Sequence, residues 1–110
     1  MTMSLLLPKP VEAYFSAENA GRPDDLAACM AADAVVFDEH QTYRGLAAIK
    51  KWKTETKAKY NHVMVPLEMQ ERDGRIVVKS RLTGSFPGSP ITLEFAFTLD
   101  GDKIKLLKIG

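Results

Sequence analysis

Apolar residues recur at helical spacing in the first half of the chain. Over residues 9–20, Val11, Tyr14 and Ala17 fall on one stripe, which predicts an amphipathic helix. Gly21 follows directly, at the position where a helix commonly ends in a left-handed residue. The pattern therefore predicts a first helix that ends at Gly21.

Two further helices are expected before residue 61. Pro23 and the acidic pair after it suit the first turn of a short helix, which we expect to run on through Cys29 and Met30. Residues 46–60 predict a longer helix, because apolar or aromatic side chains recur on one face. The members of that face are Ile49, Trp52, Thr56 and Tyr60.

The rest of the chain has the pattern of strands. Residues 34–40 are rich in β-branched and aromatic side chains, and we expect a turn at Gln41-Thr42 before a short extended Tyr43-Arg44. Four alternating segments follow, separated by turn residues such as Asp73-Gly74. They are residues 62–72, 75–86, 91–100 and 103–109. Helices followed by a run of antiparallel strands predict an α+β fold.

Composition narrows the class of protein. A chain of 110 residues is one domain, residues 1–110, because a second core of ordinary size would not fit. Hydrophobic residues at 45% and charged residues at 26% exclude disordered and fibrous proteins. The net charge of +1 gives no overall field toward nucleic acid or membranes, so we expect neither as a partner.

Cysteine and histidine usage argues against metals. Cys29 is the single cysteine, so it has no disulfide partner within the chain, and no thiolate cluster can form. His40 and His62 are not in metal-ligand spacing, so we expect no metal. Without a secretory signal or a membrane-spanning run, the sequence predicts a protein of the reducing cytoplasm.

One strand carries the candidate acid/base. Period-two alternation places Val36, Asp38 and His40 on the same face, with Phe37 on the other. A carboxylate among apolar neighbours is desolvated, which raises its pKa and makes Asp38 a usable base near neutral pH. Tyr14 lies on the apolar stripe of the first helix, where a buried hydroxyl needs a hydrogen-bond partner.

Ordinary structural roles remain open for each of these residues. Asp38 can end its strand in solvent, Tyr14 can be a core tyrosine, and His40 can lie on the surface. Lys50, Lys53 and Lys57 share a helical face, which we interpret as a solvated outer face of residues 46–60; the alternative is that these lysines attract an anionic ligand or nucleic acid.

The order of motifs resembles a known family. Residues 19–38, NAGRPDDLAACMAADAVVFD, followed by YRGLAAIKKW at 43–52, are similar to the nuclear transport factor 2-like superfamily, in particular SnoaL-like polyketide cyclases and ketosteroid isomerases. The resemblance continues over nearly the full length. It implies a cone-shaped barrel, in which three N-terminal helices are wrapped by a curved, mostly antiparallel sheet around a pocket.

The resemblance also implies chemistry. Asp38 falls where the isomerases place their base and Tyr14 where they place an oxyanion donor. Their second donor is missing, because Phe95 stands at about the matching position. That departure weighs against steroid isomerisation and favours the pattern of SnoaL-like cyclases, with Asp38 as acid/base and no cofactor.

The expected ligand is a flat or cyclic hydrophobic small molecule. We expect an apolar pocket whose walls come from several elements, with His40 as a polar contact. The predicted lining residues are Tyr14, Val36, Trp52, Phe95 and Phe97. The first hypothesis is a cofactor-free isomerase or aldol-type cyclase, and the alternative is a non-catalytic ligand-binding or protein-interaction module.

The outer face of the strands suggests assembly. Lys79 and Arg81 alternate on one strand, and Glu94 lies on the next with Thr92 and Ala96. Such a face carries both charges, so it can complement itself across a two-fold axis. We therefore expect a homodimer through the outer sheet face, with a monomer as the alternative.

Overall fold

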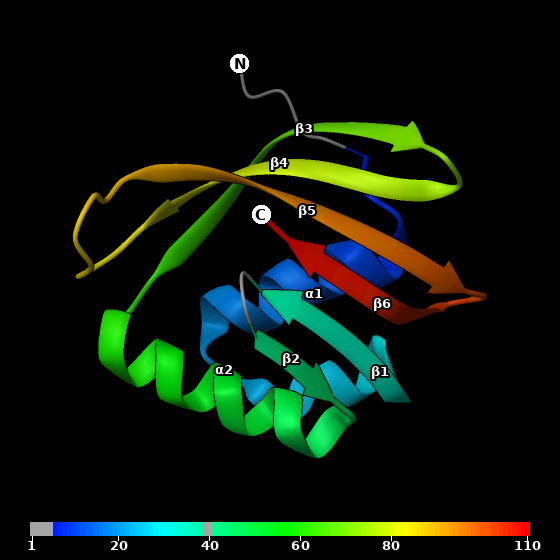
Figure 1. Ribbon diagram of the computed structural model, residues 1–110, viewed down its shortest axis with the longest axis horizontal. Helices are drawn as coiled ribbons and strands as arrows, with labels where there is room; N and C mark the ends of the chain where they lie inside the picture. Colours follow the sequence, from blue (N-terminus) through cyan, green and yellow to red (C-terminus); the bar gives the residue numbers. More distant parts are fainter. Residues whose placement is uncertain (1–5, 39–40) are drawn as a thin grey trace.

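The computed structural model describes residues 6–38 and 41–110, and Figure 1 shows its elements. In chain order these are α1 (Lys9–Ala20), the 3-10 helix η1 (Pro23–Ala28), β1 (Met30–Asp38), β2 (Gln41–Arg44), α2 (Leu46–Tyr60), β3 (Val63–Arg72), β4 (Arg75–Thr83), β5 (Ile91–Asp100) and β6 (Lys103–Ile109). The bounds of α1, α2, β5 and β6 agree with the sequence pattern.

The end of the first helix follows local chemistry. Gly21 adopts the left-handed conformation with φ 66° and ψ 37°. Arg22 N–H then donates to the Ala17 carbonyl, which satisfies one of the carbonyls that a helix end leaves unpaired. The chain can therefore turn sharply from α1 into η1.

Two expected boundaries near β1 are wrong. The short helix ends at Ala28, and Met30 opens β1, where it pairs with Ile104 of β6. The expected turn at Gln41-Thr42 is also strand, because these residues pair with Asp38 and Phe37. At Met30, pairing with a strand that is distant in sequence outweighs the local preference for helix. At Gln41-Thr42, pairing with the neighbouring strand β1 outweighs the local preference for a turn. His40 lies outside the described residues.

The six strands form one curved sheet in the order β2-β1-β6-β5-β4-β3. All neighbours are antiparallel except β1 and β6, which run parallel, as a long connection allows, because the helix α2 and four strands separate them in the chain. In Figure 1 β3, β4 and β5 arch over the helices, and α2 lies along the opposite side. The α+β cone with a mostly antiparallel sheet is thus confirmed.

The core is aromatic at its centre. Rings from α1 and β5 meet edge to face, with Tyr14 5.4 Å from Phe97 and Phe15 5.4 Å from Phe95 between ring centroids. All four side chains are buried, and edge-to-face packing adds to the stabilisation from their burial. This cluster fills the closed end of the cone and leaves the other end open.

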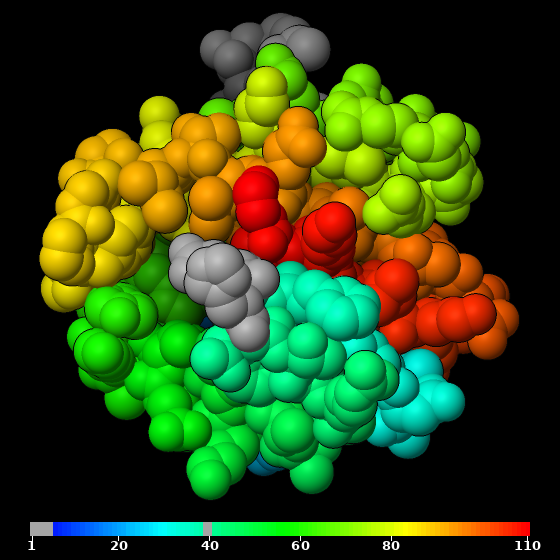
Figure 2. Space-filling view, viewed as in Figure 1, coloured from blue at the N-terminus to red at the C-terminus, as the bar shows by residue number. Residues whose placement is uncertain are grey.

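A loop borders the open end of the cone. β4 stops at Thr83, three residues earlier than the pattern predicts, and the chain turns back toward α2. Ser85 N–H donates to the Tyr60 carbonyl at 2.8 Å, and Phe86 packs edge to face on the Tyr60 ring. Figure 2 shows the loop (yellow) beside the end of α2 (green) at one edge of the molecule. The loop and helix together form part of a rim.

Candidate functional site

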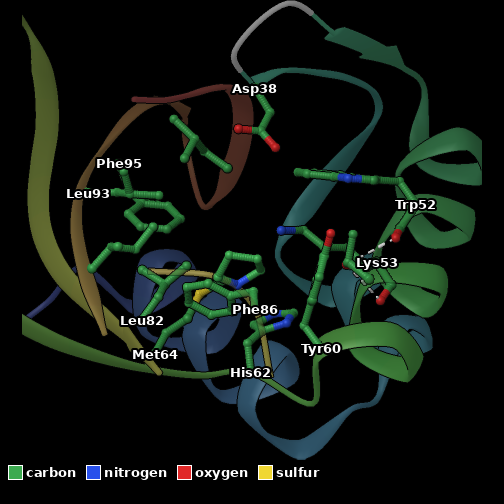
Figure 3. Close-up of a pocket in the computed structure, with 14 residues that line it drawn as sticks. Asp38, Trp52, Lys53, Tyr60, His62, Met64, Leu82, Phe86, Leu93 and Phe95 are labelled. Carbon is green, nitrogen blue, oxygen red and sulfur yellow. Dashed lines mark hydrogen bonds between the residues drawn. The ribbon is translucent and has the colours of Figure 1, made fainter. Parts of the chain in front are cut away.

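A cavity of about 440 Å³ occupies the open end of the cone. Its walls come from the ends of β1 and β6, the second half of α2, the starts of β3 and β5, the end of β4 and the loop after it. The lining residues are Asp38, Trp52, Lys53, Thr56, Tyr60, His62, Met64, Leu82, Phe86, Pro87, Ile91, Leu93, Phe95 and Ile109. Most are apolar, and Figure 3 shows them around the hollow.

Asp38 stands at the rim. Because side chains alternate along β1, Val36 is buried in the core and Asp38, two residues on, is partly buried at the strand end. Figure 3 shows its carboxylate directed into the cavity near Trp52. The Trp52 ring is stacked on Tyr43 of β2, with centroids 4.3 Å apart and planes within 10°. This stack gives the rim a rigid aromatic side.

A buried ion pair lies at the cavity wall next to Trp52. Lys53 Nζ donates to Glu18 Oε2 at 2.8 Å, and only 4% of either side chain is exposed. Burial by itself raises the pKa of the Glu18 carboxyl, but the Lys53 charge and the hydrogen bonds from His62 and Lys53 hold it below the ordinary value. Glu18 is therefore ionised at neutral pH.

Tyr14 stands behind this pair. Its hydroxyl oxygen accepts a second hydrogen bond from Lys53 Nζ at 2.8 Å, and the side chain is fully buried. Burial raises the pKa of this phenol well above its ordinary value, and the negative charges of Glu18 and Asp38 add to the effect. The expectation that Tyr14 lines the pocket is wrong, because Lys53 lies at the wall in its place.

His62 completes the polar wall. Its Nε2 lies 3.4 Å from the same Glu18 oxygen, so one carboxylate faces two basic side chains. The start of β3 is fixed against α1 by Asn19, whose side-chain amide both donates to and accepts from the backbone of Met64. The amine of Lys57 also donates to the His62 carbonyl. The backbone around His62 is thus held from both sides, and its imidazole contacts Glu18.

The structure separates the expected lining residues into two groups. Trp52 and Phe95 line the cavity. Val36 and Phe97 do not: both are fully buried in the closed core, Phe97 against the rings of Tyr14 and Phe15. The period of a strand shows which face points inward, but it cannot show how deep the packed core extends.

Sequence reasoning missed Glu18, Lys53 and His62. Lys53 was assigned to the solvated face of its helix, and that assignment is wrong. A signal was present, because Lys53 follows Ile49 by four residues and Glu18 follows Tyr14 by four, which places each charge on an apolar stripe. Opposite charges on two such stripes favour a buried pair.

Within residues 6–38 and 41–110, no group of three or more His, Cys, Asp or Glu side chains is arranged to hold a metal ion. No helix in that same part of the chain is long and apolar enough to cross a membrane.

Comparison with known proteins identifies the family. Among solved structures, a candidate polyketide cyclase from Sinorhizobium meliloti is 36% identical, with a TM-score of 0.92 over 99% of this chain and 100% of that one. A protein from Catenulispora acidiphila with a ketosteroid isomerase-like fold, solved with trimethylamine, is 21% identical, with a TM-score of 0.81 over 94% and 85%.

More distant likeness supports the fold. A nuclear transport factor 2-like protein from Cytophaga hutchinsonii is 13% identical, with a TM-score of 0.78 over 100% of this chain and 93% of that one. Comparison with curated proteins gives no match. A family model described as the SnoaL-like domain matches residues 11–106. This chain therefore belongs to the SnoaL-like domain family of the nuclear transport factor 2-like superfamily.

Proposed function

We propose that this protein binds a hydrophobic small molecule in the open end of the cone and moves a proton on it without a cofactor, as an isomerase or aldol-type cyclase. The observation that carries the proposal is the Asp38 carboxylate, directed into a mostly apolar cavity of about 440 Å³. The likeness to a candidate polyketide cyclase at 36% identity supports the same class of reaction.

Asp38 is the proposed general acid/base. Its carboxylate takes a proton from a carbon beside a carbonyl, which leaves an enolate and a protonated Asp38. In an isomerisation Asp38 returns that proton to another carbon of the same molecule. In an aldol closure the enolate carbon attacks a second carbonyl, and the proton passes to the new alkoxide. The apolar walls limit competition from water.

Tyr14 takes a different role from the one its sequence position suggests. The phenol does not reach the cavity, so it is not the direct oxyanion donor in this proposal. Its hydroxyl instead accepts a hydrogen bond from Lys53 and holds that amine at the wall. The direct donor toward an enolate oxygen is then Lys53, and Tyr14 is a positioning residue.

The test starts from ligands. Steroids, aromatic polyketides and fatty acids are screened for a rise in Tm, since a ligand that binds only the folded state stabilises it. For each carbonyl ligand that binds, NMR in D2O follows deuterium uptake at the carbon beside the carbonyl. Asp38→Asn should slow this exchange by about 10²–10⁴-fold, the usual contribution of a positioned acid/base.

Asp33→Asn is the matched control, because Asp33 is an exposed carboxylate on the same strand. It should leave exchange and binding as in the wild type. Ligand binding with exchange that is equal in the wild type and Asp38→Asn would refute catalysis and leave the alternative, a ligand-binding module. No Tm shift with any ligand class would refute the pocket itself.

We also propose that two copies pair through the outer sheet face. Lys79 lies directly opposite Glu94 on this face, and Arg81 is opposite Thr92. Glu94 also lies 3.6 Å from Arg72, so both charges are close together, as a self-complementary interface requires. Cytoplasmic localisation remains a prediction of the sequence.

A further inference from the structure

The cavity has one polar wall, and its charge is cationic on the side that faces the hollow. Among the lining residues that the structure describes, Lys53 is the one lysine or arginine, and His62 lies beside it. The balancing carboxylate, Glu18, is behind them and does not line the cavity. A ligand group that reaches this wall therefore meets the Lys53 ammonium group before it meets the Glu18 carboxylate.

The Lys53 amine is fixed before any ligand arrives. Nζ donates to Glu18 Oε2 and to the Tyr14 hydroxyl, each at 2.8 Å, and lies 4.0 Å from the centroid of the Trp52 ring. Figure 3 shows the side chain reaching toward the centre of the cavity between Trp52 and Tyr60. A lysine that is already held in place loses little side-chain entropy when it binds an anion.

The other walls fit an apolar body. Met64, Leu82, Leu93 and Phe95 form an apolar surface opposite α2 (Figure 3), and Ile109 also lines the cavity. A carboxylate, Asp38, stands at the rim and disfavours a second negative group there. The arrangement fits a molecule with one negatively charged end and one apolar end.

We infer that the natural ligand is an amphipathic anion, whose carboxylate, enolate or phenolate oxygen binds Lys53 Nζ while its ring or chain packs on the apolar walls. This inference rests on the proposed ligand pocket and narrows its substrate class. Lys53 is then the residue that sets specificity, and a neutral molecule of the same shape binds more weakly.

Two fluorescent probes test the charge requirement. Anilinonaphthalene sulfonate and phenylnaphthylamine share one ring system, and only the first carries an anionic group. Trp52 is the single tryptophan and lines the cavity, so energy transfer from it to the probe reports binding, and the Lys53 variants show whether that binding is at this site. We expect the wild type to bind the anionic probe roughly tenfold or more tightly than the neutral one, as a charged hydrogen bond implies.

The variants separate charge from folding. Lys53→Met should reduce the preference for the anionic probe to about onefold. Because this change leaves Glu18 buried without its main cation, the double variant Glu18→Gln/Lys53→Met is measured beside it, since replacing both partners costs far less than removing one. Lys51→Met, an exposed lysine on the same helix, is the control and should keep the full preference.

The outcomes are distinct. A preference that is present in the wild type and lost in both Lys53 variants supports the inference. Equal affinity for the two probes in the wild type, or a preference that the folded double variant retains, overturns it while leaving the pocket intact. Probes that show no energy transfer from Trp52 overturn the pocket as well. Asp38→Asn should not abolish the preference, so a failure of the catalytic proposal is recognised separately.

Discussion

Removing the Lys53 charge should destabilise the protein strongly at neutral pH. Two unit charges 2.8 Å apart attract by about 6 kcal/mol at an effective dielectric constant of 20. Much of that is offset by the cost of taking both groups out of water, but Lys53→Met leaves Glu18 to bear its own burial cost. We expect a loss of about 3–5 kcal/mol, and a fall in Tm of more than about 10 °C.

Lys53→Met should also reverse the way in which the ionisation of Glu18 makes the stability of the protein depend on pH. In the wild type the pKa of Glu18 is below its ordinary value of 4.5, so its ionised form stabilises the fold above that value, and this contribution is lost as pH falls through the lower, folded value. Without Lys53, burial dominates and raises the pKa of Glu18. The variant then loses stability as pH rises and regains part of it in acid.

Urea unfolding, followed by Trp52 fluorescence at about pH 7 and about pH 4.5, measures both effects. The difference in free energy of unfolding between the wild type and Lys53→Met should be largest at neutral pH and should become smaller in acid. Glu18→Gln/Lys53→Met should recover much of the loss, and Lys51→Met should stay within about 0.5 kcal/mol of the wild type. A gap that does not change with pH, or a double variant less stable than Lys53→Met, would refute this account of the buried pair.

Three further predictions concern the core, the thiol and assembly. Phe97→Ala should lower the free energy of unfolding, measured with urea, by about 3–5 kcal/mol, because the ring is fully buried against Tyr14. A decrease of less than about 1 kcal/mol would contradict the place of Phe97 in the closed core. Burial raises the pKa of the Cys29 thiol to about 11, so a disulfide reagent at about pH 8 should modify it only after unfolding, and rapid reaction in the native protein would be inconsistent with this. Light scattering at micromolar concentration should give twice the 12.2 kDa mass of one chain. Arg81→Glu should weaken the dimer, because it places a like charge diagonally across from Glu94. A monomeric wild type, or a dimer that Arg81→Glu does not weaken, would refute dimerisation through the outer sheet face.

Local chemistry determined most of the elements. The stripe that ends at Gly21, the long helix over 46–60 and the strict alternation from Ile91 to Leu99 each reflect contacts within a few residues, and the structure follows them. One of the errors came where a strand partner lies far away in sequence. Met30 is strand because it pairs with Ile104, a contact that no local pattern contains.

The same distinction between local and distant contacts applies to the candidate site. The period-two alternation of side chains predicted that Asp38 lies on the inward face of its strand, and the family resemblance indicated an open cone around it. The sequence could not determine how deep in the cone each side chain lies. Phe95 and Phe97 share a face of β5, yet Phe95 lines the cavity and Phe97 packs in the core. Depth depends on how far the rings of α1 fill the cone, which is a property of packing among several elements.

The polar wall was decided only by the tertiary structure. Lys53 and Glu18 are 35 residues apart, and although each lies on an apolar stripe, neither stripe shows that the two charges will meet. Their burial becomes favourable only when α1 and α2 pack so that the two charges meet and Tyr14 accepts a second hydrogen bond from Lys53. The sequence by itself determined the helices, the alternating strands and the inward carboxylate, because those depend on near neighbours. The pairing of distant charges against the cavity depends on the assembled fold, because a buried charge is tolerated only where its partner is already in place.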